Sequence, residues 1–233
     1  MNPPPGTREL HLAPLESLSP AQVVARHRHA QAYVAVVLSG WYEEAGDDGR
    51  WHAGPGDALF HDAMHAHFDQ VGSAGASVLN IPVSGLDGLS LPPVFRIENP
   101  DALLRKNTLD AEGVVALLRP LPGPLPLADW PDLLARALAD NDRLHLGNWA
   151  GEMGLAPATV SRGFRSAYGT SPVRYRAELR AKRALRQIRT SDVPLAAIAH
   201  DCGFADQAHL GRAIASLTGF PPGAWRTRVK SVQ

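Results

Sequence analysis

Histidine is concentrated in one short part of this chain, and its side chain is well suited to chemistry near neutral pH. Six of the ten histidines lie between positions 27 and 67. His27 and His29 are two residues apart, so on a strand both point to the same face. The segment GPGDALFHDAMHAHF adds His61, His65 and His67. This group predicts a metal site, a pocket that hydrogen-bonds a small molecule, or a polar strand face without a ligand.

A second pattern is repeated along the chain. SRGFRSAYGTSPVRYR (161–176) and GRAIASLTGFPPGAWR (211–226) keep the same spacing of arginine, glycine, proline and aromatic residues, fifty positions apart. A short helical segment ending in Gly154 or Gly203 precedes each copy, with a small residue four positions before the glycine. Such a glycine supplies the positive φ of a tight helix end, so each copy predicts a helix-turn-helix unit. The second helix of such a unit can enter the major groove of DNA.

Charge divides the chain near residue 140. Residues 1–140 contain nine Lys or Arg and 17 Asp or Glu, which gives a formal charge of −8. Residues 141–233 contain 14 Lys or Arg and six Asp or Glu, which gives a formal charge of +8. Opposite charges indicate two domains, of which the basic one suits a polyanion. The only cysteine, Cys202, excludes an internal disulfide, and we expect it to be a buried hydrophobic residue. Without a signal-like or membrane-length apolar run, we expect a cytoplasmic protein with no membrane partner.

The elements that must position the histidines are predicted to be strands. Residues 23–83 contain alternating and apolar stretches, with Gly40 ending one strand and turns at 43–50 and at GPGD (54–57). Short strands separated by regular turns favour a small barrel or sandwich. A loop is expected at 84–93.

Helical periodicity dominates the rest of the chain. It appears at 100–119 and 128–140, which are separated by the proline-rich RPLPGPLPL, and again from about 145 to the end. Residues 171–191 predict one helix of about 30 Å, close to the roughly 34 Å turn of B-DNA. This helix would hold two recognition helices against one face of the duplex. Its inward side chains are predicted to be Val173, Leu179, Ala184, Leu185 and Ile188.

These motifs resemble the DNA-binding domain of AraC/XylS-type transcription regulators. The tandem units, the connecting helix, GFADQAHLGRAI and the endings YGTSPVRYR and TGFPPGAWR occur in the family's order over about residues 142–230. The resemblance implies sequence-specific binding to double-stranded DNA. Arg212 is the only strong cation of the second recognition helix, and Gly211 and Ala215 leave bare positions there. We therefore expect the first unit to bind DNA more strongly.

Candidate DNA-contacting residues lie on the two recognition helices and on the helix between them. Arginine can pair with guanine and glutamine with adenine, although phosphate contact is an alternative role for each arginine. Arg176 and Arg226 are candidates for a phosphate-binding or a structural role. The proposed set is Thr159, Ser161, Arg162, Arg165, Arg174, Arg176, Gln207 and Arg212.

The histidine-rich part resembles the cupin barrel over about residues 25–83. The resemblance rests on His-x-His, Gly40, and Gly56-Asp57 with a histidine eleven residues after that glycine. It implies that a divalent metal is held by His27, His29 and His67. Tyr33 stands where cupins usually have an acidic ligand, and the wider candidate set for a ligand or metal adds Tyr33, His61 and His65.

Together these patterns predict an α+β protein. We expect a small cupin-like β-barrel sensor at 1–93, a helical linker and candidate dimer interface at 94–141, and an all-α tandem helix-turn-helix domain at 142–233. The predicted function is a transcription regulator, a monomer or homodimer and not an enzyme. A small-molecule effector and RNA polymerase are further candidate partners. We hypothesise that the acidic half masks the basic half until a ligand releases it. A metal-dependent cupin enzyme and a nonspecific DNA-binding protein are the alternatives.

Overall fold

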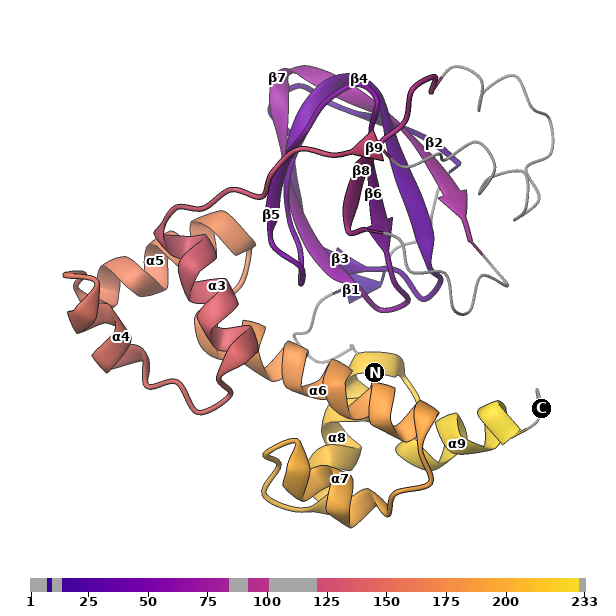
Figure 1. Ribbon diagram of the computed structural model, residues 1–233, viewed down its shortest axis with the longest axis vertical. Coiled ribbons are helices and arrows are strands. Elements are labelled where there is room, and N and C mark those ends of the chain that lie inside the picture. The colour runs from indigo at the N-terminus through magenta and orange to yellow at the C-terminus, as the bar shows by residue number, and fades with distance from the viewer. Residues whose placement is uncertain (1–7, 10–13, 84–91, 101–120, 231–233) are drawn as a thin grey trace. The chain divides into compact units, whose positions relative to one another are not determined.

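The computed structural model describes residues 8–9, 14–83, 92–100 and 121–230. The chain forms two compact units, with the boundary between Asp132 and Leu133 and with Ala167–Gly169 grouped with the first. We call the first the sheet unit and the second the helical unit. Figure 1 shows the sheet unit mainly in indigo and magenta and the helical unit in orange and yellow.

The sheet unit contains a nine-stranded sheet among the described residues, and only the pairing of β1 with β3 is parallel. The hydrogen-bonded order is β1-β3-β7-β4-β6-β8-β9, with β2 paired to β7 and β5 paired to β4. The strands are β1 (Arg8–Glu9), β2 (Leu15–Leu18), β3 (Val23–Arg28), β4 (Tyr33–Ala45), β5 (Arg50–Ala53), β6 (Asp57–His61), β7 (Ala66–Pro82), β8 (Val94–Arg96) and β9 (Leu121–Pro122).

Alternation along β4 divides the core between two faces of the sheet. Tyr33 and Ala35 pack in one buried cluster, whereas Val34 and Val36 pack in another. Both faces are therefore covered, which explains the near-continuous apolar run AYVAVVL.

The sequence predicted that this strand ends at Gly40, and this prediction is wrong. The strand continues to Ala45, and Gly40 lies inside it with φ of 69°. A Cβ atom built there would lie 1.9 Å from the carbonyl oxygen of Gly75, so only glycine permits this approach of β4 to β7. The β4–β7 register shifts on both sides of Gly40, which marks a local bulge.

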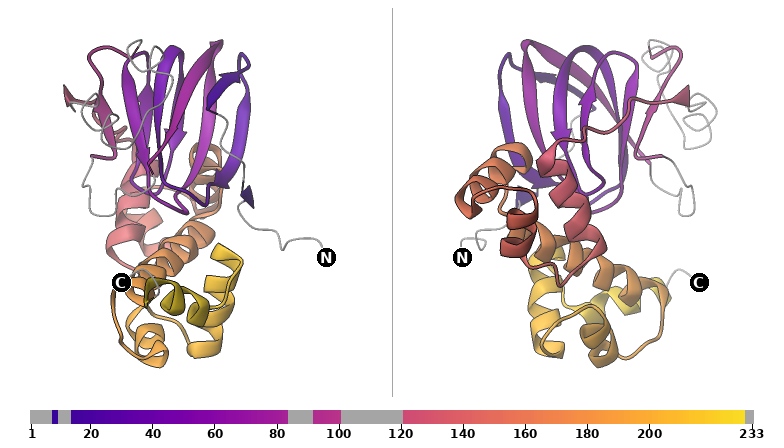
Figure 2. Two further views of the ribbon diagram at one scale, coloured as in Figure 1. Left: turned by 90° about the vertical axis from the view of Figure 1, so that its right-hand side faces the viewer. Right: turned by 60° about the vertical axis from the view of Figure 1, so that its left-hand side comes forward.

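The expected closed barrel is not what the described residues form. The path of paired strands begins at β1 and finishes at β9, and these two strands do not pair with each other. Both are two residues long, so neither offers a ladder long enough to close the sheet. Long, bent strands instead surround the interior from several sides, as Figure 2 shows.

The segment predicted to be a helical linker, 94–141, is partly strand. Val94–Arg96 and Leu121–Pro122 belong to the sheet, because hydrogen bonds to β6 and β8 outweigh any local helical preference. The sequence predicted that the proline-rich segment is not a regular helix, and residues 121–127 are indeed not helical. Helix α3 (Trp130–Asp140) matches the helix expected at 128–140. The helix expected at 100–119 lies outside the described residues, as does most of the loop expected at 84–93.

The helical unit contains two similar helix pairs joined by α6 (Figure 2). The first pair is α4 and α5, the second is α7 and α8, and α9 follows. Their bounds are α4 (Leu146–Glu152), α5 (Pro157–Tyr168), α6 (Pro172–Thr190), α7 (Leu195–Asp201), α8 (Gln207–Thr218) and α9 (Pro222–Lys230). The helices start and end close to the predicted positions, and α6 has 19 residues.

The two turns are built in the same way. Gly154 has φ of 65° and Gly203 has φ of 73°, as the sequence predicted. The amide of the next residue, Leu155 or Phe204, donates to the carbonyl of the small residue five positions earlier, at 2.8 Å in both units. Those small residues are 1% exposed, so the absence of a large side chain is what lets other helices pack against them.

Apolar side chains form the core of the helical unit. Of the residues of α6 predicted to face inward, Ala184, Leu185 and Ile188 are buried and Leu179 is half-buried. Val160, Phe164, Leu210 and Ile214 are also buried, and so are Tyr175 and Cys202. Burial raises the pKa of the Cys202 thiol, which fits a packing role. Val173 was predicted wrongly, because it is 57% exposed in the first turn of α6, on the side turned away from the core.

Gly154→Ala should destabilise the protein by about 1–2 kcal/mol, because an L side chain is strained at this positive φ even though no atom lies within 4 Å. Gly151→Ala is the matched control in the neighbouring helix α4, where added space is also free. It should stabilise by about 0.5–1 kcal/mol. Urea unfolding of the three proteins would measure this. Equal effects of the two substitutions would contradict the role of backbone strain at Gly154.

Candidate functional site

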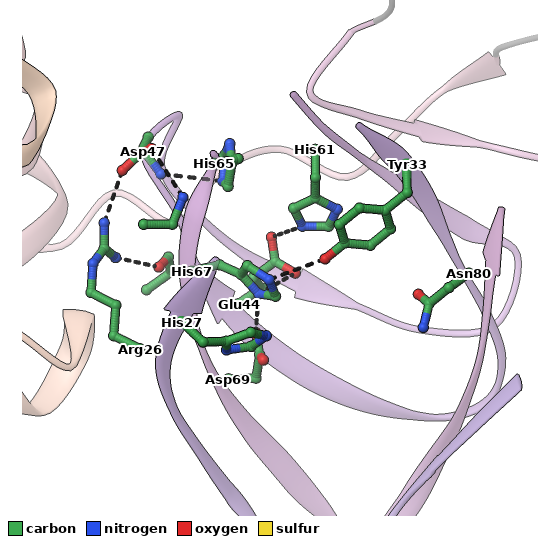
Figure 3. Close-up of polar contacts among 12 residues, drawn as sticks. Arg26, His27, Tyr33, Glu44, Asp47, His61, His65, His67, Asp69 and Asn80 are labelled. Atoms are coloured by element: carbon green, nitrogen blue, oxygen red, sulfur yellow. Dashed lines mark hydrogen bonds and ion pairs between the residues drawn. The ribbon is translucent and has the colours of Figure 1, made fainter. Parts of the chain in front are cut away.

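Five histidines and Tyr33 gather inside the sheet unit. Figure 3 shows Tyr33 with His27, His61, His65 and His67. His67 is at the centre, with its ring centroid 4.1 Å from that of His27 and 4.7 Å from that of His61. The register of the strands brings these side chains together. His27 on β3 pairs with His67 on β7, and Tyr33 on β4 pairs with His61 on β6. All six side chains are buried.

A small polar cavity lies beside these side chains. It encloses about 40 Å³ and is lined by four of the histidines, by two tyrosines, and by the carboxyl groups of Glu16, Glu44 and Asp69. One water molecule needs about 10–15 Å³ of such space, so the cavity has room for a few atoms or an ion with its water.

Hydrogen bonds determine which nitrogen of two imidazole rings carries the proton. Nδ1 of His67 lies 3.0 Å from Oδ1 of Asp69, and Nδ1 of His27 lies 3.1 Å from the carbonyl oxygen of Ala25. A carbonyl and an ionised carboxylate only accept, so each Nδ1 is the donor. Each Nε2 then keeps a lone pair, and the one on His67 accepts from the Tyr33 hydroxyl at 3.1 Å. Metal-binding histidines are commonly oriented in this way.

Burial keeps these rings neutral. Loss of hydration lowers the pKa of His27 and of His67 to about 3, and nearby histidines lower the His67 value further. Burial raises the pKa of Asp69 to about 6 and raises that of Tyr33 well above its usual value. At neutral pH the site therefore presents neutral imidazoles at His27 and His67, an ionised Asp69 and a protonated Tyr33.

Two carboxylates of the site were missed by the sequence analysis. Glu44 and Asp69 are 4% and 5% exposed. Asp69 follows His67 by two residues, so the two-residue period of a strand could have placed both on one face. Glu44 gave no such signal, because it comes from a segment interpreted as a turn. Tyr33 is not acidic, and the buried carboxylates near it come from the far end of the same strand, β4, and from β7.

The side chains form three overlapping groups of candidate metal ligands. In each group, one ligand atom from every residue lies within 4.8 Å of the others. The groups are His27, His29 and His67; Glu44, His61 and His65; and Glu44, His67 and Asp69. The first is the set that the cupin resemblance implies.

The helical unit exposes the predicted DNA-contacting residues of both recognition helices. On α5 the exposed residues are Thr159, Ser161, Arg162 and Arg165, and on α8 they are Gln207 and Arg212. Asp206 caps α8, with Oδ1 accepting from the amide of His209. Because α5 presents two of these arginines and α8 presents one, the first recognition helix carries more positive charge.

Two arginines at equivalent positions of the repeat have structural contacts. Arg176 donates from Nη1 to the carbonyl oxygen of Leu144 at 2.8 Å, and Arg226 donates from Nη2 to that of Val193. Each carbonyl lies two residues before the first helix of its unit, α4 or α7. The arginines thus tie the end of each repeat to its beginning. Arg174 is half-buried, and its Nε lies 3.2 Å from Oε1 of Glu178 on the same helix.

Sequence comparison finds relatives for the helical unit. The family model described as "Helix-turn-helix domain" matches residues 149–228. A Streptomyces lividans protein described as an AraC-like transcription regulator is 32% identical over 72 residues, which cover 31% of this chain and 24% of that protein. The match thus spans about a quarter of the length of the first AraC-like relatives.

One longer sequence match and one solved structure are also similar to this chain. A Mycolicibacterium smegmatis protein described as an S-adenosyl-L-methionine-dependent methyltransferase is 31% identical over 219 residues, covering 78% of this chain and 69% of that protein. Among solved structures, the DNA-binding domain of the global transcriptional factor AdpA, bound to a target DNA, is 25% identical with a TM-score of 0.41. It covers 46% of this chain and 97% of its own. Among the described helices, none has both the length and the apolar character needed to cross a membrane.

Arg176→Gln should lower the free energy of unfolding by about 1–2 kcal/mol, because it removes a charged donor from the carbonyl of Leu144. The matched control is Arg162→Gln, which changes an exposed arginine and should alter stability by less than about 0.5 kcal/mol. Thermal and urea unfolding would measure both. Equal stability of the two variants would show that Arg176 has no structural role.

Proposed function

Because the chain belongs to the AraC/XylS-type transcription regulators, we propose that it binds specific sequences in double-stranded DNA through α5 and α8. The observation that carries this proposal is the structural equivalence of the two helix pairs, each exposing polar side chains on its second helix. A single such helix contacts only a few base pairs. Two in one chain lengthen the recognised site and raise affinity through effective concentration, without requiring a dimer.

The length of α6 supports contact with successive segments of the major groove. Its 19 residues span about 28 Å at about 1.5 Å per residue. One turn of B-DNA is about 34 Å, so half-sites about one turn apart match this spacing.

Base contacts are proposed for the exposed polar residues of the recognition helices. Arg162, Arg165 and Arg212 would pair with guanine or phosphate and Gln207 with adenine, while Thr159 and Ser161 supply shorter contacts. Arg174 and Arg176 remain proposals for phosphate contact only, since both already contact other parts of the chain.

For the sheet unit we propose a cupin-like sensor that binds a divalent cation through His27, His29 and His67. Two observations support a cation over an organic effector. The hydrogen bond at Nδ1 orients the Nε2 lone pair of His27, and that of His67 would turn to an ion once the Tyr33 hydroxyl moves away. The cavity of about 40 Å³ is also far smaller than a pocket for a drug-sized molecule. When bound, the ion would add positive charge to the interior, and Asp69 and the Ala25 carbonyl would hold the two rings in place.

Selection of duplexes from a random DNA pool by the full-length protein should enrich two short elements about 10–11 base pairs apart. Arg162→Ala should weaken binding to the selected site by about 1–3 kcal/mol and relax sequence preference at one position. Arg136→Ala, an exposed arginine of α3 outside the matched family region, is the control for loss of one charge and should leave the preference intact.

Two other outcomes would decide between the alternatives. Binding without enrichment, with a steep dependence on salt, would identify a nonspecific DNA-binding protein instead. No binding at all, either with or without added Zn²⁺, would remove the DNA-binding proposal and leave a metal-dependent enzyme as the hypothesis to pursue.

Addition of Zn²⁺ to chelator-treated protein should tighten DNA binding at least about fivefold. One divalent ion changes the formal charge of residues 1–140 from −8 to −6, which weakens their attraction for the basic half and frees it for DNA. His67→Ala should abolish the response, whereas His52→Ala, an exposed histidine outside the cluster, should keep it. Fluorescence anisotropy would measure both. An unchanged affinity with and without Zn²⁺ would contradict control by this cation.

A further inference from the structure

We propose that the sheet unit holds a second divalent cation, bound by Glu44, His61 and His65. This inference extends the proposed cation sensor by an ion beside the three-histidine set. The second set differs from the first because it contains a carboxylate. Its members come from separate places in the sheet, Glu44 near the end of β4, His61 at the end of β6, and His65 just before β7. Figure 3 shows all three around the same interior.

The strand register brings two buried carboxylates face to face. Glu44 on β4 is the direct partner of Asp69 on β7, and both are almost completely buried. Like charges in opposed positions of a sheet repel each other, and burial strengthens the repulsion because the local dielectric constant is low. Such a pair favours a bound cation.

Arg26, a buried arginine of β3, is already engaged in other contacts. Arg26 donates to Asp47 at 2.8 Å and to the carbonyl oxygen of Ala45 at 3.2 Å. Glu44 and Asp69 instead contact the imidazoles of His61 and His67. A divalent ion would add positive charge beside these two carboxylates.

Glu44 stands between the two ligand sets. Its Oε1 lies 2.8 Å from Nε2 of His61, and its Oε2 lies 3.5 Å from Nδ1 of His67. One oxygen therefore faces the second set, while the other faces a histidine of the first. This arrangement allows two ions to occupy neighbouring positions with a carboxylate between their ligands.

His61 supplies an independent sign of a missing partner. It is 1% exposed, and among the described residues its Nδ1 has no hydrogen-bond partner. A buried polar atom without a partner is costly and calls for an explanation. The ring cannot move far, because it stacks on Tyr33 at 4.4 Å and meets His65 edge-on at 5.1 Å. An ion bound at Nδ1 would give this atom the partner that it lacks.

The spacing of the second set fits a metal ion after a small closure. Its candidate ligand atoms lie within 4.8 Å of one another. Zinc bonds to nitrogen and oxygen are about 2.0–2.2 Å long, so two ligands of one ion are at most about 4 Å apart. Inward movement of less than about 1 Å suffices. Two histidines and one carboxylate form a donor set used for Zn²⁺ and Fe²⁺.

The test is the number of Zn²⁺ ions bound by the full-length, untagged protein. The protein is stripped with a chelator, equilibrated with Zn²⁺, separated from free ion by gel filtration, and analysed for zinc per chain. We expect two ions in the native sequence. Glu44→Gln should reduce the number to one, because it removes the charged ligand while keeping the shape of the side chain. His27→Ala should also leave one ion, the one in the second set.

Controls separate the site from surface binding and from misfolding. His52→Ala removes an exposed histidine outside the cluster and should keep both ions. Circular dichroism checks the fold of each variant, and His65→Gln serves as a second test of the same site if Glu44→Gln does not fold.

The outcomes distinguish this inference from the proposed function. One zinc per chain that persists in Glu44→Gln and is lost in His27→Ala would overturn the second site alone. No bound zinc in the native sequence would overturn both cation sites, and the DNA selection would still decide the DNA-binding function. Two ions that both persist in Glu44→Gln and His65→Gln would place the second ion elsewhere and also overturn the proposal.

Discussion

Burying a polar group requires a partner, and this constraint shapes the interior of both units. In the sheet unit, Asp69 is stabilised by the ring N–H of His67. The same bond leaves the other nitrogen of that ring as an acceptor for Tyr33. The contact that makes the buried carboxylate tolerable therefore also fixes the tautomer and the orientation of the imidazole. Burial of the carboxylate and orientation of the ring rest on one interaction.

The helical unit meets the same constraint at its backbone. A carbonyl group just before α4 accepts a hydrogen bond from Arg176, and one just before α7 accepts from Arg226. The two arginines occupy equivalent positions of the repeat. Another arginine of α6, Arg180, pairs with Asp142 at 2.9 Å. The charge of +8 in the C-terminal part thus has two uses, since some cations hold the unit together and others remain exposed on α5 and α8. Counting basic residues alone would overstate the DNA-binding surface.

The two units differ in what they can recognise. Exposed, flexible polar side chains on a helix suit a large partner such as the major groove of DNA. A few atoms of space among neutral imidazoles and carboxylates suit an ion, whose charge is large although its volume is small.

Much of the helical unit was determined by sequence. Glycines at 154 and 203, small residues four positions earlier and apolar residues at helical spacing act locally, so the turns, the helices and most of their buried faces were predicted correctly. The same local information identified the histidines of the sheet unit. It failed for Gly40, for Val94–Arg96 and for the burial of Glu44, because these depend on residues far away in the chain. Strand pairing, the open ends of the sheet and the meeting of Glu44 with Asp69 were decided only by the tertiary structure, since hydrogen bonds between distant strands carry no signal in a local pattern.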